Sequence, residues 1–436
     1  MEAVDRLVAE GMSLVEAKAK ERLLTNCSRH VHEPAVSFFV PGRIEVLGKH
    51  TDYAGGRSLL CTMERGFVMM SAPRADTVVR VTNAMTDETR ELRIGAEQRG
   101  ERGHWSAYFA AVAQRLASDF PHAGRGANIA FASDLPAASG MSSSSALVIS
   151  AFLALSDAND LEQDATFTRV ITSREVLGNY LGAVENGRSF GGFAAAAGVG
   201  TLGGSQDQTA ILCCRAGMLS QYSFCPVRAE GEYPFPRDRV FVVAFSGVAA
   251  EKTSSAMLRY NEASLSVSEI VRLSNEATGR CDESLAAVIA NSQNVRDTIT
   301  KSVPTAFTIQ RLLDRYDQFA AESNDIIPAT ARAFARGDLA AVGALVDRSQ
   351  RGAEQRLGNQ IPETIALARM ARELGADAAS AFGAGFGGSV WALVTTAAAE
   401  QFTQRWHDVY ASAFPVAAAK AEFIVTRPGP PALRLA

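Results

Sequence analysis

The segment from Pro136 to Ala146 consists almost entirely of small residues and lies between a strand-like run and an apolar run. It reads Pro-Ala-Ala-Ser-Gly-Met-Ser-Ser-Ser-Ser-Ala. Small side chains let the backbone approach a phosphate closely, and amides at the start of a helix donate hydrogen bonds to an anion. A serine hydroxyl in such a loop can also reach a magnesium ion that bridges phosphates. The segment therefore predicts a phosphate-binding loop, with a serine-rich helix N-cap as the alternative.

A second segment, from Gly42 to Tyr53, gathers cationic, acceptor and donor side chains next to apolar runs. It reads Gly-Arg-Ile-Glu-Val-Leu-Gly-Lys-His-Thr-Asp-Tyr. Such a mixture of polar groups suits a polyhydroxylated ligand, and Asp52 can accept hydrogen bonds from two hydroxyls. A solvated turn is the alternative, but it does not explain why glycines flank an apolar strand. We therefore interpret this segment as a candidate binding site for a small polar molecule.

Two further segments are ambiguous when taken alone. A run before another strand-like segment contains Gly383, Gly385, Gly387 and Gly388. Glycines in this arrangement are equally typical of a tight turn or a β-bulge. Asp207 lies in Gly204-Ser-Gln-Asp-Gln208, which by itself indicates a turn residue.

In this order and at these spacings, the serine-rich, polar and glycine-rich segments resemble the three signature motifs of the GHMP small-molecule kinases. The core His50-Thr-Asp-Tyr53 is similar to that of galactokinases and related sugar kinases, and differs from that of mevalonate or homoserine kinases. The resemblance runs from residue 35 to the end of the chain. Other positions follow the same pattern: Trp105, Tyr108, Tyr260-Asn261, Ser349-Gln350, Ile361-Pro362-Glu363 and Thr426-Arg427-Pro428-Gly429.

The resemblance implies transfer of the γ-phosphate of ATP to a sugar hydroxyl, the anomeric one in galactokinases. It implies that Asp207 takes the proton of the attacking hydroxyl or holds that hydroxyl in line, while Arg43 offsets charge near the transferred group. It implies that Mg²⁺ is held by Glu185 with Ser144 or, alternatively, Ser143. The implied sugar contacts are Lys49, His50, Asp52, Gly204 and Tyr260. The implied nucleotide contacts are Trp105, Pro136, Ser139, Gly140, Met141, Ser142, Ser143, Ser144 and Ser145.

Lys49 departs from the pattern, because galactokinases have a glutamate at this position that binds the outer hydroxyls of galactose. Lysine only donates hydrogen bonds and adds a positive charge. One hypothesis is that Lys49 faces a substrate carboxylate, which makes the substrate a uronic acid such as galacturonate. The alternative is that Lys49 pairs with Glu45, where the family usually has asparagine, or turns to solvent and leaves galactose binding in place.

A second departure lies between Glu185 and Asp207, where the family has a shorter connection. This chain inserts a Gly/Ala-rich stretch at 190–204 that cannot easily hold one regular conformation. We expect a mobile loop there, whose geometry determines how the implied metal ligand and the implied base are related.

Two other functions compete with a sugar kinase. The first is a non-catalytic sensor that binds sugar and ATP, which loss of the aspartate or of the phosphate loop would indicate. Both are present, so an enzyme is favoured. The second is a GHMP kinase for a non-sugar alcohol, against which the His50-Thr-Asp-Tyr53 core argues.

The elements that must position these residues indicate two α/β domains with the site in the cleft between them, as in GHMP kinases. We expect a helical extension at 1–30, an N-terminal kinase domain with the phosphate loop at 31–230 and a C-terminal kinase domain at 231–436. Apolar patterning predicts strands at 36–40, 43–47, 127–132, 240–245, 389–394 and 422–425. It predicts helices at 146–155, 308–321 and 361–374.

Composition narrows the function classes. The 436 residues include 43 basic and 47 acidic side chains without a long run of either sign, which argues against nucleic-acid binding. No apolar segment approaches the roughly 18 residues of a membrane span, and the first residues lack the pattern of a signal peptide. Six scattered cysteines without metal-ligand spacing indicate reduced thiols. We therefore expect a cytoplasmic enzyme with a sugar and ATP as partners; nothing in the sequence points to an oligomeric state.

Overall fold

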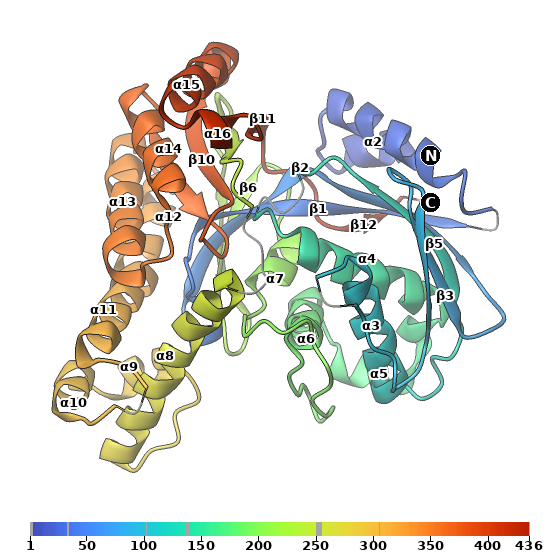
Figure 1. The fold of residues 1–436 in the computed structure, drawn as a ribbon, viewed down its shortest axis with the longest axis horizontal. Helices are drawn as coiled ribbons and strands as arrows, with labels where there is room; N and C mark the ends of the chain where they lie inside the picture. The colour runs from blue at the N-terminus through green and yellow to red at the C-terminus, as the bar shows by residue number, and fades with distance from the viewer. Residues whose placement is uncertain are drawn as a thin grey trace.

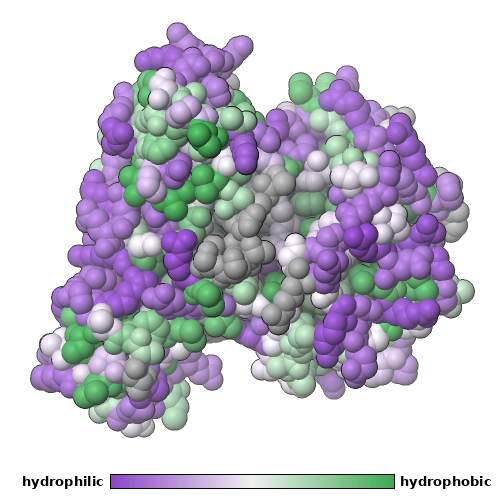
Figure 2. All heavy atoms as spheres, in the orientation of Figure 1, coloured by the Kyte–Doolittle hydropathy of each residue, from purple (hydrophilic) through white to green (hydrophobic). Residues whose placement is uncertain are grey.

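The computed structural model describes residues 3–32, 35–101, 103–136, 140–249, 255–304 and 306–435. These residues form a mixed α/β structure with two lobes, one around each sheet, as Figure 1 shows. In the same view, hydrophilic residues cover most of the outer sides of both lobes, and the outline is indented between them (Figure 2). The predicted fold class, two α/β parts with a cleft between them, is confirmed.

The larger sheet has the strand order β12-β1-β2-β5-β3-β4, and β6 and β7 extend it from β2. β12 pairs with β1 through Phe38 and Arg434, so the end of the chain returns to the sheet in which its first strand lies. β7 lies across the predicted domain boundary near residue 230. The strands are β1 (Val36–Leu47), β2 (Arg57–Pro73), β3 (Val78–Asn83), β4 (Glu88–Arg93), β5 (Ala127–Ser133), β6 (Met218–Ser223), β7 (Arg228–Pro234) and β12 (Leu433–Arg434).

Helices cover both faces of this sheet because its central strands are apolar on both sides. On β2, Val68 packs in the cluster beneath the N-terminal helices, and its neighbour Met69 packs in the cluster beneath α4. Successive side chains of a strand point to opposite faces, which gives each helical layer its own core. The helices of this lobe are α1 (Ala3–Ala9), α2 (Leu14–Cys27), α3 (Ser106–Asp119), α4 (Ser143–Ala158), α5 (Ala165–Val170), α6 (Arg174–Asn186) and α7 (Gln206–Cys213).

The second lobe is built on an antiparallel sheet with the order β11-β8-β10-β9. Its strands are β8 (Arg239–Phe245), β9 (Ala378–Phe382), β10 (Ser389–Thr395) and β11 (Glu422–Thr426). The helices are α8 (Ser255–Thr278), α9 (Leu285–Asn291), α10 (Val295–Lys301), α11 (Ile309–Ala320), α12 (Ile327–Ala335), α13 (Leu339–Gly352), α14 (Pro362–Glu373), α15 (Ala399–Ala413) and α16 (Pro415–Ala418). Two π-helical turns, Ala321–Ile326 and Ala353–Leu357, interrupt this helical layer.

Two local predictions from the sequence need correction. The strands expected at 36–40 and 43–47 are one strand, β1, in which the pairing shifts between Pro41 and Arg43. A bulge accommodates the proline, which cannot donate to the ladder. The helical extension expected at 1–30 is divided into two helices, α1 and α2, because the chain turns at Gly11 with a φ of 95°. None of the described helices combines the length and apolar character that spanning a membrane requires.

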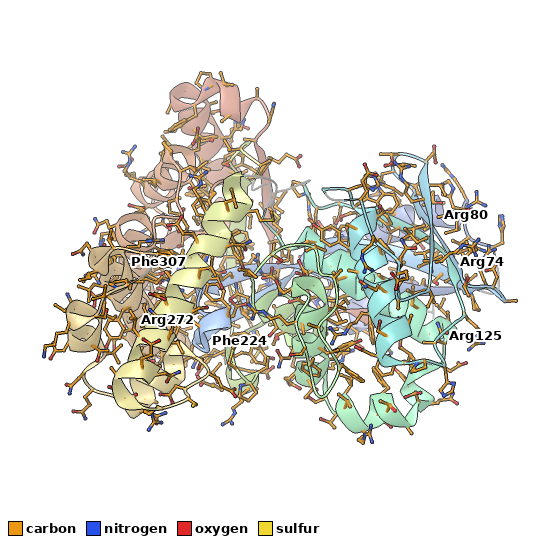
Figure 3. All side chains as sticks on the ribbon, turned by 60° about the horizontal axis from the view of Figure 1, so that its bottom comes forward. Arg74, Arg80, Arg125, Phe224, Arg272 and Phe307 are labelled. Carbon is orange, nitrogen blue, oxygen red and sulfur yellow. The ribbon has the colours of Figure 1, made fainter. Side chains whose placement is uncertain are left out.

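Arginines gather at the outer end of the first lobe, remote from α8, as the labels Arg74, Arg80 and Arg125 in Figure 3 show. Each has a carboxylate partner: Arg74 pairs with Asp76, Arg80 with Glu91 and Arg125 with Asp160. This edge is therefore a mixed-charge surface.

Candidate active site

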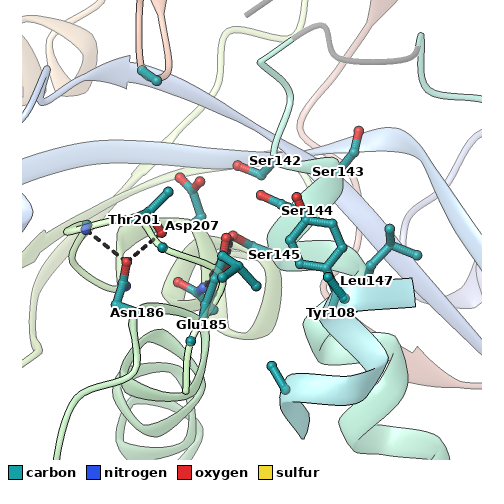
Figure 4. A pocket seen from close by; sticks show the side chains of 18 of the residues that line it. Tyr108, Ser142, Ser143, Ser144, Ser145, Leu147, Glu185, Asn186, Thr201 and Asp207 are labelled. Atoms are coloured by element: carbon teal, nitrogen blue, oxygen red, sulfur yellow. Dashed lines mark hydrogen bonds between the residues drawn. The ribbon is translucent and has the colours of Figure 1, made fainter. Parts of the chain in front are cut away.

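A cavity of about 770 Å³ lies where the two lobes meet. Its size suits a nucleotide and a small second ligand. The first lobe supplies most of its wall, from β1, the turn at 50–52, and the starts of α4 and α7, while Tyr260, Gly383 and Ala384 come from the second. Figure 4 shows the serines at the start of α4 facing Glu185 and Asp207 from the opposite side.

Arg43 and Asp207 form an ion pair in this cavity. Arg43 Nε donates to Asp207 Oδ1 at 2.7 Å, and Arg43 Nη1 donates to the Gly140 carbonyl oxygen at 2.8 Å. Asp207 lies in the first turn of α7, where the helix dipole favours a carboxylate. The Arg43 side chain is 3% exposed and that of Asp207 20%, so the aspartate is the partner that a ligand can reach. The structure thus joins the two predicted catalytic residues and ties them to the phosphate loop.

Glu185 lies at the end of α6 and is buried beside the start of α4. Its Oε2 accepts hydrogen bonds from Ser145 Oγ at 2.8 Å and from Gln208 Nε2 at 2.6 Å. The sequence pointed to Ser144 or Ser143 as the serine that acts with Glu185. The structure adds Ser145, whose hydroxyl contacts that carboxylate directly. Carboxylate and hydroxyl oxygens are ligands that Mg²⁺ accepts, so this group fits such an ion.

The turn after β1 holds His50 in the left-handed region, with a φ of 57°. His50 Nε2 lies 2.9 Å from the Ala384 carbonyl oxygen and Nδ1 lies 2.9 Å from the Tyr53 hydroxyl. The carbonyl can only accept, so Nε2 carries the proton and Nδ1 accepts from tyrosine. Burial lowers the pKa of His50 to about 4, and the charges of Arg315 and Arg311 act in the same direction. The imidazole is therefore neutral at pH 7.

Asp52 is buried next to this histidine, and its Oδ2 accepts a hydrogen bond from the Gln206 amide at 3.1 Å. Burial raises the pKa of Asp52, and the Gln206 amide opposes that rise. The Gly204 backbone lies so close to Asp52 that a Cβ at position 204 would be only 2.3 Å from Asp52 Oδ2. The ring of Tyr260 packs on His50 with centroids 4.9 Å apart. All four of these predicted sugar contacts line the same part of the cavity.

Lys49 is not among the residues that line the cavity, and its contact with the sugar stays a prediction. It is buried, and its Nζ donates to Ser349 Oγ at 3.1 Å. Ser349 Oγ in turn donates to Glu322 Oε1 at 2.9 Å, which also accepts from the Gly48 amide at 3.0 Å. The amine therefore neither turns to solvent nor forms a hydrogen bond with Glu45. The Ser349 hydroxyl thus links the amine to the Glu322 carboxylate.

Some of the remaining predicted site residues line the cavity, and others lie behind its wall. Trp105 lines the cavity, and its Nε1 donates to Glu88 Oε2 at 3.0 Å. The Met141 side chain belongs to the hydrophobic core, while its carbonyl oxygen accepts from the Arg43 amide at 3.3 Å. Pro136 is buried outside the lining, and Ser139 lies outside the described residues. The lining serines and glycine of the loop are Gly140, Ser142, Ser143, Ser144 and Ser145.

The third motif forms a turn of left-handed glycines, of which Gly383 alone lines the cavity among the described residues. A Cβ at Gly385 would lie 2.2 Å from the Asn359 carbonyl oxygen, and one at Gly387 would lie 2.7 Å from that of Val248. Gly385 and Gly387 therefore allow close backbone packing, and Gly388 forms backbone hydrogen bonds with Val248 and Ser246. Their turn carries Ala384, whose carbonyl oxygen fixes His50.

The Gly/Ala-rich stretch at 190–204 contains no helix or strand and lines the cavity with several backbone positions. Asn186 fastens it, because its Oδ1 accepts from Thr201 Oγ1 at 2.9 Å and from the Gly203 amide at 2.8 Å (Figure 4). Its mobility stays a prediction. The sequence assigned no role in the site to six further cavity residues: Glu45, Gln98, Arg99, Gln114, Asn186 and Gln206. Glu45 and Gln206 lie within segments quoted above, whereas Gln98, Arg99 and Gln114 belong to none of them.

Comparison with known proteins adds three family models. The galactokinase galactose-binding signature matches residues 28–73, the GHMP kinases N terminal domain matches 107–215 and the GHMP kinases C terminal model matches 330–412. The chain is 28% identical to galactokinase of Chloroflexus aurantiacus over 87% of this chain and 89% of the relative. It is 32% identical to galactokinase of Haemophilus influenzae over 28% of this chain and 32% of the relative.

Among solved structures, galactokinase of Lactococcus lactis in complex with galactose has a similar fold. The TM-score is 0.78 at 22% identity, and the match covers 96% of this chain and 99% of the other. The residue ranges that match these family models include Arg43 and the His50 turn in 28–73, and the serine-rich loop and Asp207 in 107–215. The chain therefore belongs to the GHMP kinases and is a galactokinase-like, ATP-dependent sugar kinase.

Proposed function

We propose that this protein transfers the γ-phosphoryl group of ATP to the anomeric hydroxyl of galactose. The observation that carries the proposal is the Arg43–Asp207 pair, which lies in one cavity with the helix-start serines and the His50 turn. The relatives named galactokinase support galactose as the acceptor. The position of Lys49 removes the support for a uronic acid, because its amine has its partner in Ser349.

In the proposed reaction the sugar lies among His50, Asp52, Gly204 and Tyr260. The anomeric oxygen forms a bond to the γ-phosphorus, the bond from that phosphorus to the β–γ bridging oxygen breaks, and ADP leaves. Asp207 accepts the proton of the attacking hydroxyl or holds that hydroxyl in line. Arg43 compensates negative charge on the transferred group.

The nucleotide is proposed to bind with its phosphates at the start of α4 and its base towards Trp105 and Tyr108. Amides at a helix start suit a polyphosphate. Glu185 with Ser144 and Ser145 would hold Mg²⁺, which, when bound, neutralises charge on the phosphates. We also propose that the enzyme acts in the cytoplasm, which supplies ATP and keeps thiols such as its six free cysteines reduced.

The test is ADP release with galactose, arabinose, glucose, N-acetylgalactosamine and galacturonate, for the wild type and for Asp207→Asn. Galactose is expected to be the preferred acceptor, and Asp207→Asn to lower kcat by about 10² to 10⁴. Asp160→Asn, an exposed carboxylate paired with Arg125, is the matched control and should keep full activity.

Three results would contradict the proposal. Preference for galacturonate would restore the uronate alternative. Binding of sugar and ATP without turnover would indicate a sensor. Full activity of Asp207→Asn would remove Asp207 from the mechanism.

A further inference from the structure

Glu45 is a buried carboxylate in the wall of the active cavity. It lies on β1 two residues after Arg43, so both side chains point to the same face of the strand. Glu45 is 1% exposed, and its Oε2 accepts a hydrogen bond of 2.6 Å from Gln206 Nε2. Its Oε1 is buried without a hydrogen-bond partner among the described residues. Burying a carboxylate with one oxygen unpaired lowers the stability of the fold, so we expect Glu45 to have a function that offsets this cost.

Gln206, the partner of Glu45, connects several parts of the site. Its backbone amide donates to Asp52 Oδ2 at 3.1 Å, and its side-chain oxygen accepts from Ser58 Oγ at 2.8 Å. Gln206 is also the first residue of α7, directly before Asp207. A displacement of Gln206 would therefore move the aspartate that pairs with Arg43 and the amide that holds Asp52.

We propose that Glu45 is a positioning residue for phosphoryl transfer, which holds Gln206 and thereby fixes Asp207 against Arg43 and Asp52 against the sugar. This inference rests on the proposed sugar-kinase function. The contact spans two elements that are distant in the chain, since Glu45 and Gln206 are separated by 161 residues. This hydrogen bond of 2.6 Å joins two buried side chains and therefore fixes the position of the start of α7 relative to β1.

Charged groups around Glu45 couple it to the same reaction. They are Arg43 on β1, Lys49 on the turn that follows and Asp207 on α7. Burial raises the pKa of Glu45 to about 7, although Arg43 and Lys49 oppose that rise. Ionised Glu45 forms a charge-assisted hydrogen bond with Gln206, and its negative charge favours the uptake of a proton by Asp207. Both effects should raise kcat/KM for the sugar as the pH rises through about 7.

Two substitutions separate the hydrogen bond from the charge. Glu45→Gln keeps the volume and an oxygen that can accept from Gln206, but it loses the charge. Glu45→Met removes the acceptor and keeps a side chain of similar length. Ser58→Ala removes the other side-chain contact of Gln206 and serves as a comparison, because Ser58 does not line the cavity.

The experiment measures kcat, the KM for galactose and the KM for ATP from pH 5.5 to 9, with thermal unfolding of each variant as a check on folding. Glu45→Met should lower kcat/KM for galactose by roughly tenfold to a hundredfold with little change in the KM for ATP. Glu45→Gln should recover most of kcat and lose the rise near pH 7. Ser58→Ala should change sugar kinetics in the same direction as Glu45→Met, and less.

Wild-type kinetics in Glu45→Met would overturn the inference and leave the kinase function intact. An unchanged pH profile in Glu45→Gln would remove the charge coupling. If Glu45→Met raised the KM for galactose and the KM for ATP by the same factor, the effect would be a general structural defect, which would contradict the positioning role. If the wild type phosphorylates no sugar, the proposed function fails instead.

Discussion

Replacing Gly204 with alanine should disable the sugar site by displacing Asp52. A Cβ at this position would lie 2.3 Å from Asp52 Oδ2 and 2.5 Å from Asp52 Cγ. Ordinary contact between such atoms requires a separation larger by roughly 1 Å. Gly204 does not have a positive φ, so its backbone accepts alanine and the effect is steric. Asp52 is buried and bonded to the Gln206 amide, so it has little room in which to move.

A misplacement of this size near reacting groups costs about 10²-fold, or about 3 kcal/mol of transition-state stabilisation. We therefore expect Gly204→Ala to lower kcat/KM for galactose by about 10² and to leave the KM for ATP almost unchanged. Overpacking should also lower the free energy of unfolding by about 1–3 kcal/mol. Steady-state kinetics with one substrate saturating, and urea unfolding, measure the two effects.

The matched control is Gly95→Ala. Gly95 also lacks a positive φ, and a Cβ there would meet nothing within 4 Å. It should keep wild-type kinetics. Wild-type kcat/KM for galactose in Gly204→Ala would refute the assignment of Asp52 and Gly204 to the sugar site, as would a loss confined to the KM for ATP.

Three further predictions concern buried ionisable side chains in and beside the cavity. Lys49→Met removes the buried cation that Ser349 links to the Glu322 carboxylate, so the free energy of unfolding should fall by about 1–3 kcal/mol while the sugar preference stays the same; a changed preference at wild-type stability would refute this. His50 has its pKa lowered to about 4, below the unfolded value near 6.5, so its contribution to stability is present above about pH 6.5 and is lost as the pH falls towards 4. Urea unfolding should show about 2–3 kcal/mol more loss over that window in the wild type than in His50→Gln, and equal losses would contradict the buried neutral state. Glu185→Gln should raise the Mg²⁺ concentration for half-maximal activity by roughly tenfold or more in a titration at fixed ATP, and an unchanged titration would exclude Glu185 as a ligand.

Much of the site could be predicted from the sequence because its motifs carry backbone requirements as well as chemistry. The serine-rich segment begins α4, Asp207 lies in the first turn of α7, and both face the cavity. The close approach of Gly204 to Asp52 is visible only in the structure. Each of the two residues nevertheless lies within a sequence segment that resembles a GHMP kinase pattern. The mixed α/β character of both halves also follows from apolar periodicity that the strands and helices retain.

What the sequence could not supply depends on contacts between distant segments. The direction of Lys49 is determined by Ser349, 300 residues further along the chain, and by Glu322 on a π-helical turn. The choice of Ser145 as the partner of Glu185 depends on the rotation of the first turn of α4, which spacing does not define. β12 consists of two residues, too few for a periodic pattern, and pairs with β1 because the end of the chain returns there.

The most direct test of the central claim is the identity of the product formed from galactose and ATP. Phosphorus NMR of the reaction mixture should show one new phosphomonoester whose phosphorus couples to the anomeric proton, together with an equal amount of ADP. The Asp207→Asn variant should form the same product at a rate lower by about 10² to 10⁴. A phosphate on any other carbon, or release of inorganic phosphate without a sugar phosphate, would contradict the account.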